Sequence, residues 1–148
     1  MAQASSYTYQ NVVVTIAGLL VEGFFDGDDA ITIEPGVDTG TGLVGADGSS
    51  IWSGSADNSA TITLNLMHTS DAHRLLTQLL QVQRTPSRRS PGFSIAINEV
   101  GSNEGGSADR CYILTPPTDS KGKAATVRSW VLWTGDYRRL IPNGGAIL

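Results

Sequence analysis

Residues 59–84 carry the sequence SATITLNLMHTSDAHRLLTQLLQVQR, in which one hydrophobic periodicity gives way to another. From Ala60 to Leu66, apolar residues alternate with Thr and Asn, which is the period of a β-strand with one apolar and one polar face. The apolar residues that follow are three and four positions apart, as in an amphipathic helix; they are Ala72, Leu75, Leu76, Leu79 and Leu80. The pattern predicts a strand that leads into a helix at about residues 70–84.

Flanking residues set the limits of this helix. Thr69, Ser70 and Asp71 provide an N-cap and an acidic residue in the first turn, and Pro86 ends the segment. The chain has 17 glycines, only 16% charged residues and many Thr, Ser and Val, which favour turns and strands. We therefore expect a mainly β fold with this one flanking helix.

Length and cysteine content limit the class of protein. At 148 residues the chain is most simply a single domain, 1–148. Cys111 is the only cysteine, so no disulfide can form within the chain. No apolar run approaches the roughly 18 residues of a membrane span, and residues 1–6 lack the basic and apolar regions of a signal peptide.

Other segments predict further strands, namely residues 11–16, 19–25, 30–34, 93–98, 108–114 and 125–133. The last of these has apolar residues on both faces: Ala125, Val127, Val131 and Trp133 on one, Trp130 and Leu132 on the other. We expect it to be buried on both faces, inside a sandwich or at a subunit contact. Residues 1–10 and 136–148 are expected to be terminal arms.

Residues 37–58 form a glycine-rich segment that predicts an extended loop or hairpin, with its turn at Asp47 and Gly48. Compact domains seldom keep so long an excursion without a use. Trp52 within it has two interpretations, an exposed aromatic residue at an interface or a side chain folded back on the core.

Charge is divided unevenly along the chain. Residues 1–73 contain no Lys or Arg and carry a net charge of −9, whereas residues 74–148 carry +5, in agreement with the overall −4. Two interpretations are open: the two halves interleave in the fold and the division has no use, or subunits meet through acidic and basic surfaces.

Signs of catalysis are absent from the sequence. His68 and His73 are five positions apart, which does not place them on one helix face, and no third histidine or cysteine pair completes a zinc site. Ser70, Asp71 and His73 are too close in sequence to act as a triad. The acidic turn at residues 26–29 is interpreted as solvated rather than metal-binding, and the basic segment 84–91 as a solvated loop or a contact to an acidic neighbour rather than to phosphate. We expect no enzyme, no metal and no cofactor.

The order of these motifs resembles a known family. A strand at residues 30–34 is followed by Gly-Ala-Asp-Gly-Ser at 45–49, the alternating strand at 59–66, the His-Thr-Ser cap at 68–70, a leucine helix, and a final strand with tryptophan. Together they are similar to the tail tube proteins of long-tailed bacteriophages, in particular a family from contractile-tailed phages. The resemblance covers roughly residues 11–83 well and the final strand more loosely.

The resemblance implies a β-sandwich or β-barrel subunit with a flanking helix. Six such subunits form a ring, and the rings stack into a hollow tube that conducts phage DNA into the host. The implied partners are other copies of the chain, the tail sheath, terminator, baseplate and tape-measure proteins, and double-stranded DNA passing without specific binding. The implied location is the virion, after assembly in the host cytoplasm.

Candidate contact residues follow from this resemblance. Gly45, Asp47, Gly48 and Trp52 are predicted to contact neighbouring subunits, and Thr61, Thr63 and Asn65 to face the lumen. The alternative function is a non-enzymatic β-sandwich binding module, a carbohydrate-binding or capsid-decoration domain, in which Trp52 forms part of an aromatic platform.

Overall fold

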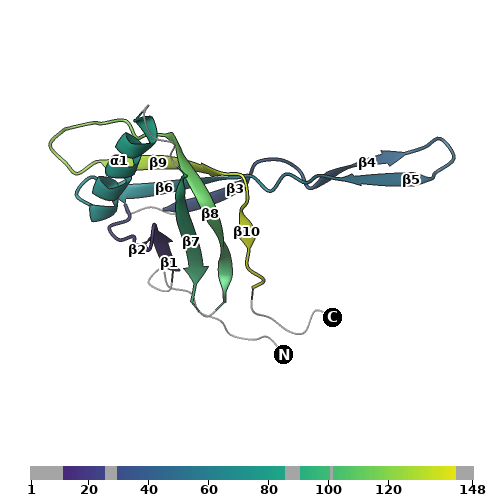
Figure 1. The fold of residues 1–148 in the computed structure, drawn as a ribbon, viewed down its shortest axis with the longest axis horizontal. Helices are drawn as coiled ribbons and strands as arrows, with labels where there is room; N and C mark the ends of the chain where they lie inside the picture. Colours follow the sequence, from purple (N-terminus) through teal and green to yellow (C-terminus); the bar gives the residue numbers. More distant parts are fainter. Residues whose placement is uncertain (1–11, 26–29, 86–90, 101, 143–148) are drawn as a thin grey trace.

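The structure of the chain is a computed structural model that describes residues 12–25, 30–85, 91–100 and 102–142 (Figure 1). Its elements are β1 (Val12–Ile16), β2 (Leu19–Leu20), β3 (Ile31–Pro35), β4 (Gly40–Val44), β5 (Ser50–Gly54), β6 (Ala60–Met67), α1 (Asp71–Arg84), β7 (Phe93–Glu99), β8 (Glu104–Thr115), β9 (Val127–Thr134) and β10 (Arg138–Arg139). A mainly β fold with one flanking helix is therefore confirmed.

One antiparallel sheet forms the body of the molecule, in the strand order β2-β1-β7-β8-β9-β6-β3, and β10 pairs with β8. Among the strands that the structure describes, the sheet does not close into a barrel, because β2 and β3 are its two ends. The segment after β2 nevertheless crosses from β1 to β6. The Val21 amide donates to the Val14 carbonyl at 2.8 Å, and the Met67 amide donates to the Gly23 carbonyl at 2.8 Å.

The core lies between the folded sheet and α1. It is formed by apolar side chains from both halves of the chain, namely Val14, Ile16, Ile62, Leu64, Leu66, Leu76, Ile95, Cys111, Ile113, Trp130 and Leu132. The alternation predicted for β6 is confirmed: Ala60, Ile62, Leu64 and Leu66 are buried and the residues between them are half-buried. Burial of apolar side chains at about 25 cal/mol per Å² is the main stabilising contribution to such a core.

Both ends of α1 are fastened to the body. The Ser70 hydroxyl accepts from the Ala72 amide at 3.1 Å, as an N-cap, and donates to the Glu22 carbonyl. At the other end, the Gln83 side chain donates to the Ile113 carbonyl and accepts from the Ile113 amide, both at 2.9 Å. This pair of bonds joins the helix to β8 where β8 departs from regular pairing with β9, between Ile113 and Thr115.

Burial of β9 differs from the prediction. Arg128, Trp130, Leu132 and Thr134 face the core, whereas Val127 and Trp133 are exposed, Trp133 by 40%. The expectation that both faces are buried is wrong for the single chain, in which only one face of β9 packs against the core. Ala125 precedes the strand, which begins at Val127.

Two other predicted segments differ in extent. Of the strand expected at residues 19–25, Leu19–Leu20 pairs with β1 and Phe24 forms a single bridge to Leu66. Of the arm expected at residues 136–148, Arg138–Arg139 lies on β8 as β10. Residues 1–10, 26–29 and 143–148, and Arg88 and Arg89 of the basic segment, lie outside the described residues.

Candidate assembly surfaces

The β4–β5 hairpin projects from the body and pairs with no other strand in the described part of the chain (Figure 1). Its turn is closed by the Gly45 amide, which donates to the Ser49 carbonyl at 2.7 Å. The Asp47 carboxylate accepts from the Ser49 hydroxyl at 2.6 Å and from its amide at 3.0 Å, and these bonds hold the pKa of Asp47 below its usual range. Gly48 adopts a φ of +87°, which favours glycine. The turn predicted at Asp47 and Gly48 is therefore confirmed.

Large apolar side chains are exposed on this hairpin, namely Leu43, Val44, Ile51 and Trp52. Trp52 is 65% exposed, so the interpretation in which it folds back on the core is wrong. Its indole lies against β4, where a Cβ on Gly40 would come within 2.6 Å of the ring and one on Gly42 within 3.7 Å. Two glycines thus leave room for the ring to lie on the strand, which positions it before any partner binds.

The base of the hairpin is held at a fixed place on the body. The Gly36 amide donates to the Ser59 carbonyl at 2.8 Å, and the Asp57 carboxylate accepts from the Ser59 amide at 2.8 Å. The Tyr137 amide donates to the Asn58 carbonyl at 3.0 Å. These bonds join the two ends of the hairpin segment to each other and to the segment that leads into β10.

A second surface is the outward face of β6 and β9. Thr61, Thr63 and Asn65 lie on the side of β6 opposite the core and are half-buried. Their partners on β9 are Trp133, Val131 and Ser129 respectively. The Ser129 hydroxyl donates to the Asn65 side-chain oxygen at 2.6 Å. The three residues predicted for the lumen therefore share one face, and this face also carries the apolar side chains of β9.

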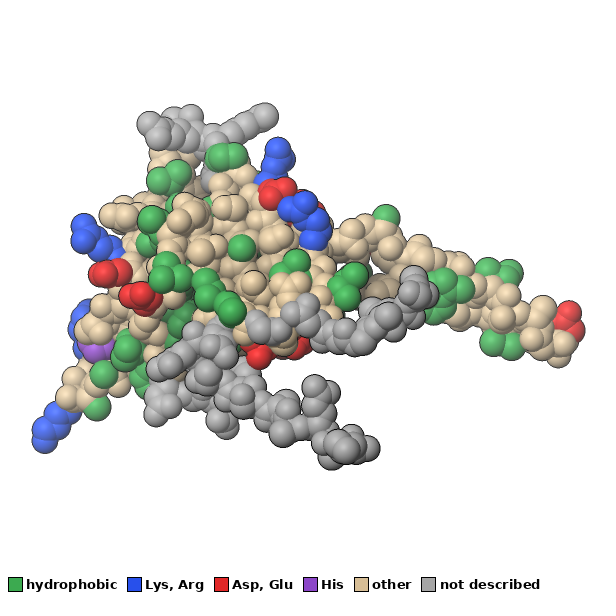
Figure 2. Space-filling model, turned by 90° about the horizontal axis from the view of Figure 1, so that it is seen from below, with side chains coloured by type: hydrophobic (Ala, Val, Ile, Leu, Met, Phe, Trp, Pro, Cys, Tyr) green, Lys and Arg blue, Asp and Glu red, His purple; other side chains and the backbone are tan. Residues whose placement is uncertain are grey.

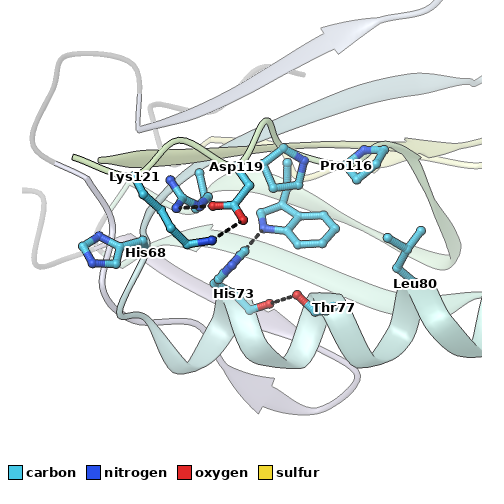
Figure 3. Close-up of a pocket in the computed structure, with 10 residues that line it drawn as sticks. His68, His73, Thr77, Leu80, Pro116, Asp119 and Lys121 are labelled. Carbon is cyan, nitrogen blue, oxygen red and sulfur yellow. Dashed lines mark hydrogen bonds and ion pairs between the residues drawn. The ribbon is translucent and has the colours of Figure 1, made fainter. Parts of the chain in front are cut away.

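A third surface is a pocket of about 440 Å³ between α1, β9 and the loop that follows β8 (Figure 3). Its lining residues are His68, His73, Thr77, Leu80, Pro116, Pro117, Asp119, Lys121, Arg128 and Trp130. The Trp130 indole N–H donates to Nδ1 of His73 at 3.0 Å. Burial lowers the pKa of His73, and the positive charge of Arg128 lowers it further.

Arg128 holds the loop at residues 116–126 against the body. Its side chain is buried and donates to the Asp119 carboxylate at 2.9 Å and to the Ser120 carbonyl at 3.1 Å. It also donates to the Thr126 hydroxyl at 2.6 Å. Lys121 binds the same carboxylate at 2.9 Å, and this ion pair lowers the pKa of Asp119. The pocket thus has two cations beside one carboxylate.

His68 and His73 both line this pocket, although their spacing in the sequence does not predict that they lie together. Helical geometry does not place them on one face, but His68 precedes the helix, and both side chains line the pocket. The Thr126 amide donates to Nδ1 of His68 at 3.4 Å. Arg128 was missed by sequence reasoning, although a charged residue within an apolar strand is a recognisable signal.

Reactive chemistry is limited in the part of the chain that the structure describes. No group of three His, Cys, Asp or Glu residues there is placed to hold a metal ion. Cys111 is buried, which raises the pKa of its thiol to about 12 and keeps it protonated. Within the same ranges, no helix is both long enough and apolar enough to cross a membrane.

Comparison with known proteins places the chain in a family. Residues 4–141 match the family described as Bacteriophage PhiTE tail tube protein. The chain belongs to this tail tube protein family. It is 28% identical over 108 residues to "Structural protein ORF10" of Pseudomonas phage KPP10. This alignment covers 73% of this chain and 62% of that protein. The match thus spans less than two thirds of that relative's length.

A solved structure shares the fold. The tube terminating cap of the anti-feeding prophage superposes with a TM-score of 0.60 at 12% sequence identity, covering 95% of this chain and 94% of the cap chain. At this identity the likeness shows the fold alone. Family membership makes this tail tube protein a structural component of a phage, located in the virion, and its family is a structural rather than an enzymatic one.

Proposed function

We propose that copies of this chain form hexameric rings that stack into a hollow tail tube and conduct phage DNA. Family membership carries the proposal. It is supported by a sheet whose described strands leave β2 and β3 as its two ends, and by an apolar hairpin that extends away from the core. Monomeric proteins seldom leave sheet edges and apolar surface of this kind uncovered.

Lateral contacts join the open sheets of neighbouring subunits around the ring. A head-to-tail contact gives a ring when the rotation from one subunit to the next brings the last copy back to the first. It gives an open filament when that rotation does not close the circle. Closure removes sheet edges, which otherwise promote irregular association. The exposed apolar residues of β2, Leu19 and Leu20, lie at one end of the strand order and are available for such a contact.

Axial contacts use the hairpin. Gly45, Asp47, Gly48 and Trp52 lie on it. The hairpin projects from the body (Figure 2), which supports their role in binding a neighbouring subunit. A positioned aromatic side chain provides contact area with little loss of rotamer freedom.

The outward face of β6 lines the lumen in this proposal. By strand register, the outward residues of β3, β6 and β9 include Thr32, Glu34, Thr61, Thr63, Asn65, Ser129 and Val131. Along these three strands the outward face has no Lys or Arg. Because cationic side chains drive binding to phosphates, a wall without them lets DNA pass without being retained.

The remaining partners follow from the same assembly. The sheath protein wraps the tube on the side of α1, whose polar face is turned away from the core. Terminator, baseplate and tape-measure proteins bind the ends and interior of the tube, and assembly takes place in the host cytoplasm.

Negative-stain electron microscopy of the purified full chain tests the proposal. We expect rings with sixfold symmetry and hollow tubes, over a range of salt concentrations. A protein that stays monomeric at high concentration in every salt condition contradicts it. Rings of another subunit number would contradict the hexamer alone.

A further inference from the structure

The hairpin and the pocket lie at opposite ends of the long axis of the molecule (Figure 1). The hairpin extends from one end, and α1 and the loop after β8, which line the pocket, form the other. A contact between two opposite ends is head-to-tail and repeats from copy to copy, so it generates a stack rather than a closed pair.

The chemistry of the two ends is complementary. Residues 30–58 contain four acids, Glu34, Asp38, Asp47 and Asp57, and no Lys or Arg. In the pocket Lys121 and Arg128 share the one carboxylate of Asp119. Figure 2 shows an acidic side chain at the tip of the hairpin, and Lys, Arg and His side chains beside acidic ones at the opposite end.

Apolar surfaces match as well. Leu80, Pro116, Pro117 and Trp130 contribute apolar walls to the pocket. Its volume of about 440 Å³ is within the range of pockets that bind small ligands, so it has room for a large side chain. The hairpin offers Trp52, which β4 already holds in place.

We propose that the hairpin of one copy docks into this pocket of the next copy, with Trp52 against its apolar wall and Asp47 beside Lys121. The inference rests on the proposed tube and adds the receiving site. Lys121 suits this role because its side chain is 84% exposed although it is paired with Asp119. Arg128 is buried and bonds to Asp119, Ser120 and Thr126, so it shapes the pocket and stays in place.

A charge exchange in the full chain tests the docking. Asp47→Lys and Lys121→Glu are made singly and together, and the concentration at which tubes form is measured by light scattering and microscopy. Like charges at a contact oppose association, so each single variant should raise this concentration by about tenfold or more. The double variant, and an equimolar mixture of the two single variants, should assemble near the wild-type concentration.

Matched controls separate docking from folding. Lys123→Glu changes the same charge two residues away, outside the lining of the pocket, and should assemble as wild type does. All variants should retain the wild-type free energy of unfolding. Assembly of Lys121→Glu at the wild-type concentration, or no recovery in both the double variant and the mixture, overturns the docking. If the wild-type chain itself forms no tubes, the proposed function is what fails.

Discussion

Trp130 and His73 are joined by a hydrogen bond of 3.0 Å from the indole N–H to Nδ1, with their ring centroids 5.6 Å apart. The bond requires neutral Nδ1 as the acceptor, because a protonated imidazole has only donors. It satisfies the indole of a fully buried tryptophan in the core. The protonation of one half-buried histidine is therefore linked to the packing of β9.

This linkage predicts a loss of stability in mild acid. The folded-state pKa of His73 is lowered from 6.5, chiefly by burial, so the unfolded chain binds more protons as the pH falls through this value. The free energy of unfolding should therefore decrease below about pH 6.5 and continue to fall until the lowered pKa is reached. Urea unfolding of the wild type at pH 7.5 and 5.5 measures the decrease.

His73→Gln keeps a side-chain acceptor without a titrating group, so its stability should change less between the two pH values. His68→Gln removes a charge that contributes to the lowered pKa of His73, so the acid sensitivity should weaken less than in His73→Gln. An unchanged pH dependence in His73→Gln would assign the acid sensitivity to other groups.

Arg128 predicts a separate effect on the loop after β8. Its side chain is 6% exposed and bonds to Asp119, Ser120 and Thr126. Arg128→Met removes these bonds while filling the space, and should lower the free energy of unfolding by about 1–3 kcal/mol. The cost stays below that of a fully buried pair, because the partner Asp119 is 63% exposed and returns to water.

Limited trypsin digestion measures how firmly the loop after β8 is held in the wild type and in Arg128→Met. Lys121 and Lys123 lie in the loop and are exposed, so Arg128→Met should be cleaved there faster than the wild type. Asp119→Asn removes only one partner and should give an intermediate rate. Equal cleavage rates in all three proteins would show that the loop is held by other contacts.

Local periodicity was enough to predict β6 and α1, and the turn-forming residues Asp47 and Gly48 were enough to predict the hairpin turn, because each depends on neighbours in sequence. Ser70 caps the helix and Ala72 and Leu76 are buried as their spacing indicates. The mainly β class followed from the same patterns and from composition. These features need no knowledge of which strands pair.

Burial of β9 and the pocket were not predictable in this way. β9 is apolar on both faces, so periodicity could not distinguish Trp130, which is buried, from Trp133, which is exposed. The pocket brings His73 to Trp130, 57 positions later in the sequence, through the order of strands and a loop held by Arg128. Contacts at this separation depend on the whole sheet rather than on local sequence.

Gly40 is predicted to be essential for the position of Trp52. A Cβ at Gly40 would lie 2.5 Å from the Ser53 carbonyl oxygen and 2.6 Å from the indole, so Gly40→Ala must displace both. Because the hairpin lies outside the core, the free energy of unfolding should change by less than about 0.5 kcal/mol, whereas tube formation should need a higher protein concentration.

Gly42→Ala is the matched control for this variant. Its Cβ would meet the indole at 3.7 Å, an ordinary contact, so assembly should be retained. Acrylamide quenching of tryptophan fluorescence reports whether the indole has moved. If Gly40→Ala assembles as readily as Gly42→Ala, the position of Trp52 does not matter for the contact between subunits.

Gln83 is predicted to stabilise the junction of α1 and β8. Its side chain satisfies both backbone groups of Ile113 at 2.9 Å, in a half-buried position. Gln83→Ala leaves these groups without the side-chain partner and should lower the free energy of unfolding by about 1–3 kcal/mol. Gln78→Ala, on the exposed side of the helix, should change it by less than about 0.5 kcal/mol. Equal effects of the two variants in urea unfolding would contradict a role for this junction.

The lumen assignment predicts a gain of DNA binding when a cation is introduced. Thr63 lies at the centre of the outward face of β6, opposite Val131, and its side chain is half-buried in the single chain. If this face lines the tube, Thr63→Lys repeats a positive charge in every subunit, and assembled tubes should retain double-stranded DNA in a filter-binding assay. The retention should fall steeply as the salt concentration is raised, because binding to phosphates releases counterions.

Gln78→Lys adds the same charge on the outer side of α1, and its tubes should bind DNA only at their outside. Ejection of DNA through the tube should then slow for Thr63→Lys and stay unchanged for Gln78→Lys, and equal ejection in both would place the β6 face away from the lumen.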